Sequence, residues 1–166
     1  MKITAFFTRI LNWFTGSRLT VDNSAVGALD LDRFLGSWYE VARFDHFFER
    51  GMSQTKANYV LRDDGNIDVT NTGVKGGQPK TAKGLAKLTD VPSLLRVSFF
   101  GPFYSDYRVM LVDADYRYML IGSGSDGYLW ILSRTPQLAD SDCTAILSEA
   151  KSRGYDTDKL IWVKQN

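Results

Sequence analysis

Short runs of β-branched and aromatic residues, separated by turn residues, fill most of the chain after Gly36. Apolar and polar positions alternate within these runs, which is typical of strands with one buried face. Eight runs have the length of a strand: residues 37–45, 54–62, 66–72, 79–88, 94–100, 107–113, 116–122 and 128–134. The pattern therefore predicts an all-β core.

The links between these predicted strands are short. Gly65 follows two aspartates and supplies the positive φ that a tight hairpin requires. Three glycines within residues 122–127 indicate another hairpin. Sequential antiparallel strands leave two exposed sheet edges, and closing the sheet removes both. We therefore predict an eight-stranded antiparallel up-and-down β-barrel, a calyx.

The hydrophobic period becomes helical at both ends of the chain. Residues 135–154 predict one C-terminal α-helix packed outside the barrel, and a short ninth strand is expected at residues 160–164. Residues 1–20 predict an extra N-terminal amphipathic helix. Residues 21–30 are polar and resemble a linker, which leaves residues 31–166 as the barrel domain.

The N-terminal segment, residues 1–20, contains three basic residues and no acidic one. Arg9 and Asn12 interrupt the apolar centre that a secretory signal requires, so this segment would be an atypical export signal. The apolar stripe is shorter than the roughly 20 residues of a membrane span. A basic helix lying on a membrane surface fits the stripe best. A helix packed on the barrel and a disordered tail remain alternatives.

The composition excludes several classes of protein. A chain of 166 residues with 44% hydrophobic residues is long enough for one domain with its own core. The net charge of +1 argues against a nucleic-acid partner. One histidine, His46, and one cysteine, Cys143, are poor material for a metal site, so we expect neither a metal nor another cofactor. The acidic residues near Cys143 disfavour a reactive thiolate.

Three motifs occur in order on the predicted strands. They are Gly36-Ser37-Trp38 at the first strand, Asp113-Ala114-Asp115-Tyr116 at the hairpin between the sixth and seventh strands, and Ser133-Arg134 at the end of the eighth strand. This pattern resembles the lipocalin family, although Ala114 stands where that family usually has threonine. Longer strings at residues 38–51, 97–104 and 128–136 are similar to the bacterial outer-membrane lipocalins, relatives of apolipoprotein D. The resemblance covers residues 31–165.

The resemblance implies a hydrophobic-ligand carrier. It implies a fatty acid or lysophospholipid as ligand, a homodimer, and a peripheral position at the bacterial outer membrane or in the periplasm. That subgroup usually carries an acylated N-terminal cysteine, which this sequence lacks, so a cytoplasmic, membrane-associated protein is the alternative. The residues that the resemblance marks as structural are Gly36, Trp38, Asp113, Asp115, Tyr116 and Arg134.

Trp38 and Arg134 also have a physical interpretation. The indole would close one end of the barrel, and the guanidinium would lie across it, a cation–π contact worth roughly 1–2 kcal/mol when it is desolvated. Gly36 would permit the turn into the first strand.

Alternate residues of each strand would face the barrel interior. The phase of the alternation follows from Trp38 and from the resemblance. The expected ligand-binding residues are Glu40, Ala42, Phe44, Ala57, Tyr59, Ile67, Val69, Asn71, Ala82, Ala86, Val97, Phe99, Val109, Leu111, Leu120, Tyr128 and Trp130, with Gly84 and Leu132 on the same face. Such a wall is mostly apolar, as in small-molecule sites.

Glu40 is the exception in this wall, because a buried carboxylate needs a partner. Arg96, Arg108 and Tyr128 are the candidates. Glu40 would either form a structural pair or orient the polar head of a ligand.

Catalysis has little support in the sequence, so we expect a binding protein and no enzyme. His46 is interpreted as a polar residue at the barrel rim. Two alternatives remain: a lipocalin-fold enzyme that uses Glu40 as an acid or base on a lipid-like substrate, and a scaffold that binds proteins through its outer surface. The aromatic residues within 99–104 either form an exposed patch for a partner or membrane, or pack inward over the rim.

Overall fold

The computed structural model describes residues 19–165. The helix predicted for residues 1–20 therefore lies almost entirely outside the described residues. The elements are α2 (Leu31–Phe34), β1 (Gly36–Phe44), β2 (Ser53–Leu61), β3 (Ile67–Lys75), β4 (Gln78–Leu88), β5 (Leu94–Phe100), β6 (Phe103–Val112), β7 (Tyr118–Gly122), β8 (Leu129–Ser133), α3 (Asp140–Ser152), the 3-10 helix η1 (Thr157–Lys159) and β9 (Leu160–Trp162).

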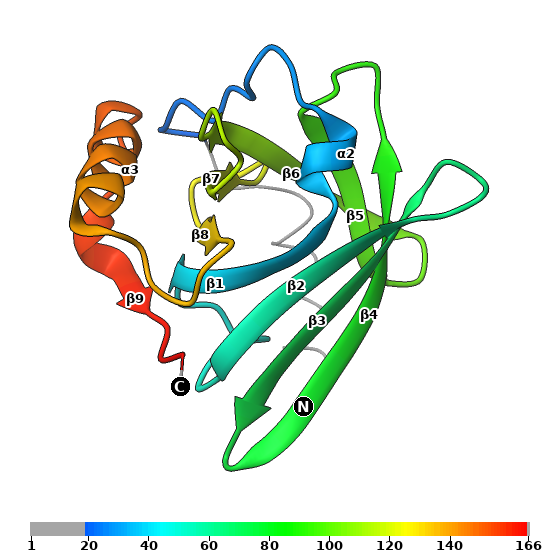
Figure 1. Cartoon of the computed structure of the whole chain (residues 1–166), viewed down its shortest axis with the longest axis horizontal. Helices are drawn as coiled ribbons and strands as arrows, with labels where there is room; N and C mark the ends of the chain where they lie inside the picture. The colour runs from blue at the N-terminus through cyan, green and yellow to red at the C-terminus, as the bar shows by residue number, and fades with distance from the viewer. Residues whose placement is uncertain (1–18, 166) are drawn as a thin grey trace.

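The strands form one closed antiparallel sheet. Each strand from β2 to β7 pairs with the next, β8 pairs with β1, and β1 pairs with β2. The ninth strand, β9, adds to the end of β1, and α3 packs on the outside of the barrel beside β7 (Figure 1). The predicted eight-stranded barrel with one outer helix and one extra strand is confirmed.

Several element boundaries differ from the prediction. The helical pattern runs from residue 135, with Asp140 and Ser141 suited to the helix start, and α3 does begin at Asp140. Before it, Thr135 Oγ1 donates to the carbonyl of Gln137 at 2.7 Å, within a non-helical turn. The strand β6 begins at Phe103, four residues early, because it pairs with β5 through Phe100. Gly154 ends the helix region with φ +95°, as expected of a C-terminal cap.

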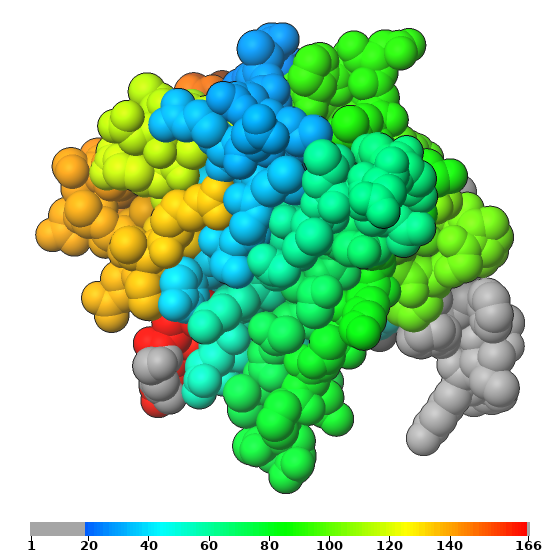
Figure 2. Space-filling model, turned by 45° about the vertical axis from the view of Figure 1, so that its right-hand side comes forward, coloured from blue at the N-terminus to red at the C-terminus, as the bar shows by residue number. Residues whose placement is uncertain are grey.

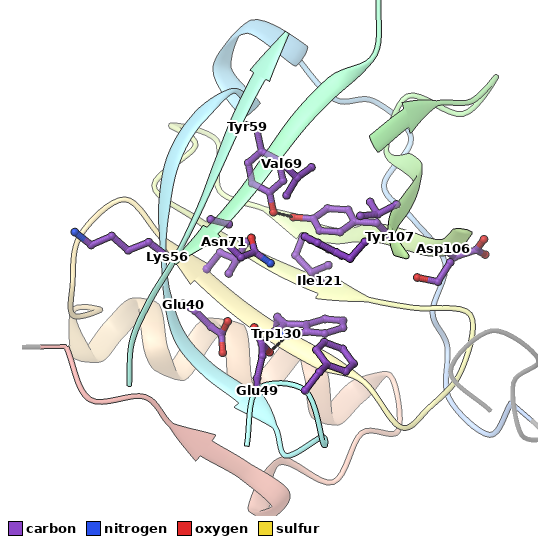
Figure 3. Close-up of a pocket in the computed structure, with 16 residues that line it drawn as sticks. Glu40, Glu49, Lys56, Tyr59, Val69, Asn71, Asp106, Tyr107, Ile121 and Trp130 are labelled. Carbon is purple, nitrogen blue, oxygen red and sulfur yellow. Dashed lines mark hydrogen bonds between the residues drawn. The ribbon is translucent and has the colours of Figure 1, made fainter. Parts of the chain in front are cut away.

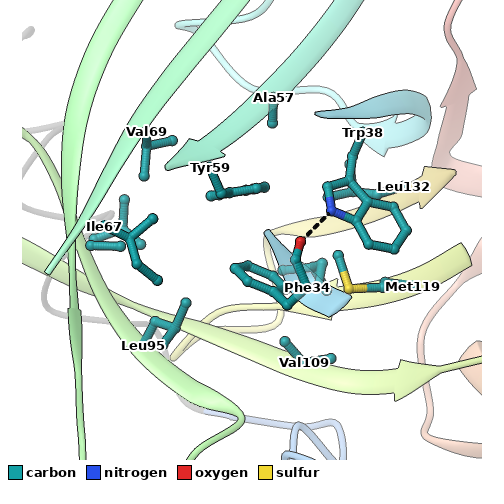
Figure 4. Packing of buried hydrophobic residues seen from close by; sticks show 13 residues of the cluster. Phe34, Trp38, Ala57, Tyr59, Ile67, Val69, Leu95, Val109, Met119 and Leu132 are labelled. Atoms are coloured by element: carbon teal, nitrogen blue, oxygen red, sulfur yellow. Dashed lines mark hydrogen bonds between the residues drawn. The ribbon is translucent and has the colours of Figure 1, made fainter. Parts of the chain in front are cut away.

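The closed end of the barrel is built around Trp38. Its ring lies 3.6 Å from Arg134 Cζ, and its indole N–H donates to the carbonyl of Phe34 at 2.8 Å (Figure 4). Arg134 also donates to the backbone carbonyls of Ser37 and Leu35, at 2.9 and 3.0 Å. The predicted stacking of Arg134 on Trp38 is confirmed, and it ties β1 to β8.

The other marked residues lie at the same end. Asp113 accepts from the guanidinium of Arg117 at 2.9 Å and from the backbone N–H of Asp115 at 3.2 Å. The hydroxyl of Tyr116 accepts from the backbone N–H of Asp30 at 2.7 Å. Gly36 has φ +96°, which favours glycine. These contacts hold the links at the closed end together.

Two apolar layers share the sheet. One fills the closed half of the barrel around Phe34, Trp38 and Ile67 (Figure 4). The other lies between the outer face of the sheet and α3, around Ile131 and Ile146. Residues of a strand alternate between these layers unless a bulge intervenes.

Two β-bulges make part of the predicted lining wrong. In β1 the register shifts between Glu40 and Ala42, and in β6 it shifts between Val109 and Leu111. A bulge inserts one extra residue and reverses the alternation beyond it. The side chains of Ala42, Phe44 and Leu111 therefore lie in the outer layer under α3 and not inside the barrel.

Leu120 also lies in the outer layer, contrary to the prediction. It pairs with Ile131 of β8, whereas its neighbour Ile121 pairs with Trp130. Directly paired residues share a face of the sheet. Met119 and Ile121 therefore face the interior in place of Leu120.

The segment from residue 21 to 30, which we expected to be a linker, lies along the barrel surface. The N–H of Val26 donates to the carbonyl of Val109 at 2.9 Å, and the guanidinium of Arg153 donates to the carbonyls of Asp22 and Ser24 at 3.1 and 2.9 Å. At its start, Thr20 Oγ1 donates to Asp126 in the link between β7 and β8, at 2.6 Å. The described chain thus begins near the end of the barrel opposite to Trp38.

Candidate functional site

A cavity occupies the half of the barrel opposite to Trp38. Its deep chamber has a volume of about 80 Å³, and a wider chamber at the mouth has about 490 Å³. The wider volume lies within the roughly 300–1,000 Å³ of small-molecule sites. Phe48, Glu49, Lys56, Asn71 and Phe99 contribute to the walls of both chambers, so the two chambers adjoin at these residues.

Most of the predicted residues lie where the prediction placed them. The deep chamber is lined by Glu40, Ala57, Tyr59, Val69, Asn71, Val97, Phe99, Trp130 and Leu132, and Ala82 lines the mouth. Ile67, Ala86 and Val109 face inward but belong to the packed layer beneath the cavity. Tyr128 lies beside the cavity, with its ring stacked 5.8 Å from that of Trp130. A binding role for each of these residues stays a prediction.

The structure adds lining residues that we did not predict. They are Phe48, Glu49, Met52, Thr55, Ser105, Tyr107 and Ile121. Thr55 has the same parity as Ala57, and Tyr107 has the same parity as Val109, so alternation could have found both. Phe48, Glu49 and Met52 belong to the link after β1, where no periodicity applies.

The deepest polar groups are two tyrosine hydroxyls. Tyr59 and Tyr107 are hydrogen-bonded to each other at 2.9 Å across the barrel (Figure 3). Burial raises the pKa of both phenols, so they stay neutral. Apolar side chains of Val69 and Ile121 lie beside them.

Glu40 has a partner that we did not predict. Its carboxyl lies 2.9 Å from Nη1 of Arg43, whereas Arg96 and Arg108 both pair with Asp106. The bulge in β1 explains the error, because it returns Arg43 to the face of Glu40. Burial, and secondarily the nearby Glu49, raise the pKa of the Glu40 carboxyl well above its ordinary value.

Glu49 is the second buried carboxyl. Burial alone would raise its pKa, but the close contact with His46 and the hydrogen bond from the Trp130 indole outweigh burial and lower it. His46 Nε2 lies 2.6 Å from Glu49 Oε2, and Trp130 Nε1 donates to the same oxygen at 3.1 Å (Figure 3). His46 is therefore a buried residue and not the polar rim residue that we expected.

The link between β1 and β2, residues 45–52, is held across the cavity by these contacts. Arg43 Nη2 donates to the carbonyls of Glu49 and Met52, at 2.8 and 3.1 Å. The ring of His46 lies between Phe48 and Trp130, with centroid distances of 3.9 and 5.6 Å. The link thereby forms one wall of the cavity.

The aromatic residues at the end of β5 and the start of β6 divide between the two expected positions. Phe99 lines the cavity. Phe100 and Phe103 expose 41% and 46% of their surface, and Tyr104 packs under Lys87 Nζ at 4.5 Å.

No group of three metal-binding side chains gathers anywhere within residues 19–165. The same stretch of chain holds no helix that is long and apolar enough to cross a membrane. Cys143 is half-buried, and burial together with Asp140 raises the pKa of its thiol.

Comparison with known proteins agrees with this geometry. A family profile described as a lipocalin-like domain matches residues 29–165. This chain belongs to the lipocalin family. The contact of Arg134 with the ring of Trp38 is thus a contact between two lipocalin motifs.

Two relatives and one structure illustrate the range of similarity. The chain is 47% identical to the outer membrane lipoprotein Blc of Citrobacter freundii over 146 residues, covering 86% of this chain and 82% of that protein. It is 32% identical to mouse apolipoprotein D over 147 residues, covering 82% and 77%. Lobster apocrustacyanin A1 has the same fold, with a TM-score of 0.72 at 20% identity over 91% of this chain and 89% of that one.

Proposed function

We propose that this lipocalin binds a single-chain hydrophobic ligand, a fatty acid or a lysophospholipid, in the barrel cavity and stores or transports it. The observation that carries this proposal is the pair of adjoining chambers between the neutral tyrosine pair and the mouth, with mostly apolar walls. Its relatives named outer membrane lipoprotein support a place at the bacterial envelope.

The energetics suit a chain of ordinary length. Burying about 16 methylene groups contributes about 13 kcal/mol at about 0.8 kcal/mol each. If association costs about 4–5 kcal/mol, at the lower end of the usual range, about 8 kcal/mol remains, which corresponds to micromolar affinity.

The charges favour a ligand whose head group is at the mouth. Lys75 and Lys80 line the mouth on the inner face of the β3–β4 hairpin, which projects beyond the rest of the barrel (Figures 1 and 2). Glu49 lies further in and keeps its charge, so an anionic head at that depth would be repelled. Lys56 points away from the cavity, with its Nζ 4.6 Å from the ring of Tyr39 (Figure 3).

Two interactions complete the proposal. The basic N-terminal residues 1–20 would bind a membrane surface. The exposed Phe100 and Phe103 at the mouth would form part of a homodimer contact.

The cavity is tested by narrowing its deep chamber. Ala57→Leu adds three carbons there, which would displace about three ligand methylenes and weaken binding of oleate about 10- to 50-fold. Thr70→Leu, on the outward face of β3, is the matched control and should bind as the unaltered protein does. Binding is measured by titration and by native mass spectrometry, with circular dichroism to verify folding.

Two results would reject the proposal. One is an unaltered protein that takes up neither oleate nor a lysophospholipid. The other is a folded Ala57→Leu variant that binds both ligands as tightly as the Thr70→Leu variant.

A further inference from the structure

Two buried polar atoms in the cavity wall have no hydrogen-bond partner among the described residues. They are the hydroxyl oxygen of Thr55 and the side-chain oxygen of Asn71. Thr55 is only 3% exposed. A buried polar group that stays unpaired is unfavourable, so such groups in a cavity wall indicate that a ligand atom supplies the partner.

The two side chains share one wall. Asn71 pairs with Ala57 across β2 and β3. Thr55 lies in the irregular stretch between Ser53 and Lys56, but its methyl group packs against Gly73, two residues after Asn71, so Thr55 and Asn71 are diagonal neighbours on the inner face. Such neighbours have Cβ atoms at most about 7–8 Å apart, a gap that one small polar group can bridge. Thr55 lines the mouth chamber, and Asn71 lines both chambers and points into the cavity (Figure 3).

The surrounding structure fixes the position of the Thr55 hydroxyl. Gly73 leaves the space that the Thr55 methyl group occupies, since a Cβ there would lie 2.9 Å from that methyl carbon. The carbonyl of Thr55 accepts a hydrogen bond from Gln165 Nε2 at 2.9 Å, and the N–H of Gln54 donates to the carbonyl of Lys164 at 2.7 Å. The C-terminal residues thus hold the strand whose hydroxyl is unpaired.

These two groups lie between an apolar end and a basic end. The hydrocarbon walls of Tyr59, Val69 and Ile121 are on the deep side. Lys75 on β3 and Lys80 on β4 are further out, at the mouth. A hydroxyl can donate to the Asn71 oxygen and accept from Thr55 at once. A simple fatty acid has no such group between its chain and its charge.

We propose that Thr55 and Asn71 form a hydrogen-bonding site for a hydroxyl that the ligand carries between an anionic head and a single acyl chain. The site would favour monoacylglycerol phosphates over amphiphiles without that hydroxyl. This inference rests on the proposed ligand-binding function and names the class of ligand that the cavity selects.

The test uses two ligands that differ in one hydroxyl. They are 1-palmitoylglycerol 3-phosphate and 3-(palmitoyloxy)propyl phosphate, both titrated below their micelle-forming concentrations by calorimetry. The full chain should bind the hydroxyl-bearing ligand about 5- to 10-fold more tightly, the effect of one net hydrogen bond. Thr55→Val and Asn71→Leu should each bring this ratio close to one, and Thr70→Val, on the outward face, should leave it unchanged.

The ratio of the two affinities separates a polar contact from a general effect on packing, because a structural defect weakens the binding of both ligands alike. Equal affinities of the unaltered protein for the two ligands would overturn the hydroxyl site and leave the proposed function standing. A preference that survives in both variants would also overturn it. Failure of the protein to bind either ligand would overturn the proposed function itself, and the hydroxyl site with it.

Discussion

Glu40 shows how a few side chains determine the charge inside the barrel. Of the two buried carboxyls, Glu40 pairs with Arg43 and Glu49 contacts His46, and Arg43 also donates to the backbone carbonyl of Glu49. The pKa of Glu40 is raised and the pKa of Glu49 is lowered, so Glu40 takes up a proton before Glu49 as the pH falls.

The pH dependence of stability should differ between the two carboxyls. A raised pKa contributes stability below the ordinary value of 4.5, and this contribution is lost as the pH rises through the raised pKa. Glu40→Gln removes this loss of stability. Between pH 4.5 and the raised pKa, the free energy of unfolding of the variant should therefore rise relative to that of the unaltered protein by about 1.4 kcal/mol for each pH unit. Urea unfolding between pH 4.5 and 8.5 measures the difference.

Glu49→Gln is the matched control, with the opposite sign. Its lowered pKa contributes stability above the ordinary value, which is lost as the pH falls, so this substitution should destabilise at neutral pH and matter least in acid. If Glu40→Gln destabilised the protein at pH 8 as Glu49→Gln does, our assignment of the raised pKa to Glu40 would be wrong.

The contacts of single residues could be predicted where a sequence motif places them, and not where a β-bulge changes the face on which a neighbouring side chain lies. Trp38 and Arg134 meet as expected because the motifs place them on adjacent strands at one end. The partner of Glu40 could not be predicted, since Arg43 faces inward only because of a bulge. Alternation with period two contains no information about where an extra residue interrupts it.

At the scale of elements, the eight strands and the helix follow from the hydrophobic pattern, but their faces follow from pairing. Leu120 and Ile121 are both apolar and both buried, so the sequence of β7 alone does not say which one faces inward. The register with β8 does, since Ile121 pairs with Trp130. The link over residues 45–52 could not be predicted as a cavity wall, because its position depends on contacts of Arg43.

The strand β4 lets Phe99 lie against its backbone. A Cβ at Gly84 would be 2.8 Å from two ring carbons of Phe99 and 2.7 Å from the carbonyl oxygen of Ser98. We expect Gly84→Ala to force β4 and β5 apart and to destabilise the fold by about 1–3 kcal/mol.

Gly27→Ala serves as the comparison for that substitution, because nothing lies within 4 Å of its Cβ position. It should change the free energy of unfolding by less than about 0.5 kcal/mol. Chemical denaturation of both variants measures the contrast, and equal midpoints would contradict the close packing of Phe99 on β4.

At the scale of the whole molecule, the barrel and the N-terminal segment should act independently. Removing residues 1–18 leaves the contacts between residues 21–30 and the barrel in place, so oleate affinity should stay within twofold while binding to anionic vesicles falls at least 10-fold. Vesicle flotation and ligand titration of the two proteins measure this. Equal flotation before and after truncation would show that the segment does not bind membranes.

The contact between Thr20 and Asp126 has a consequence for how cargo would be exchanged. It holds Thr20 against the link between β7 and β8, at the same end of the barrel as the mouth. If residues 1–18 bind a membrane as we propose, attachment next to this point would turn the mouth toward the bilayer and the Trp38 end toward water. A lipid that left the bilayer would then enter the cavity directly.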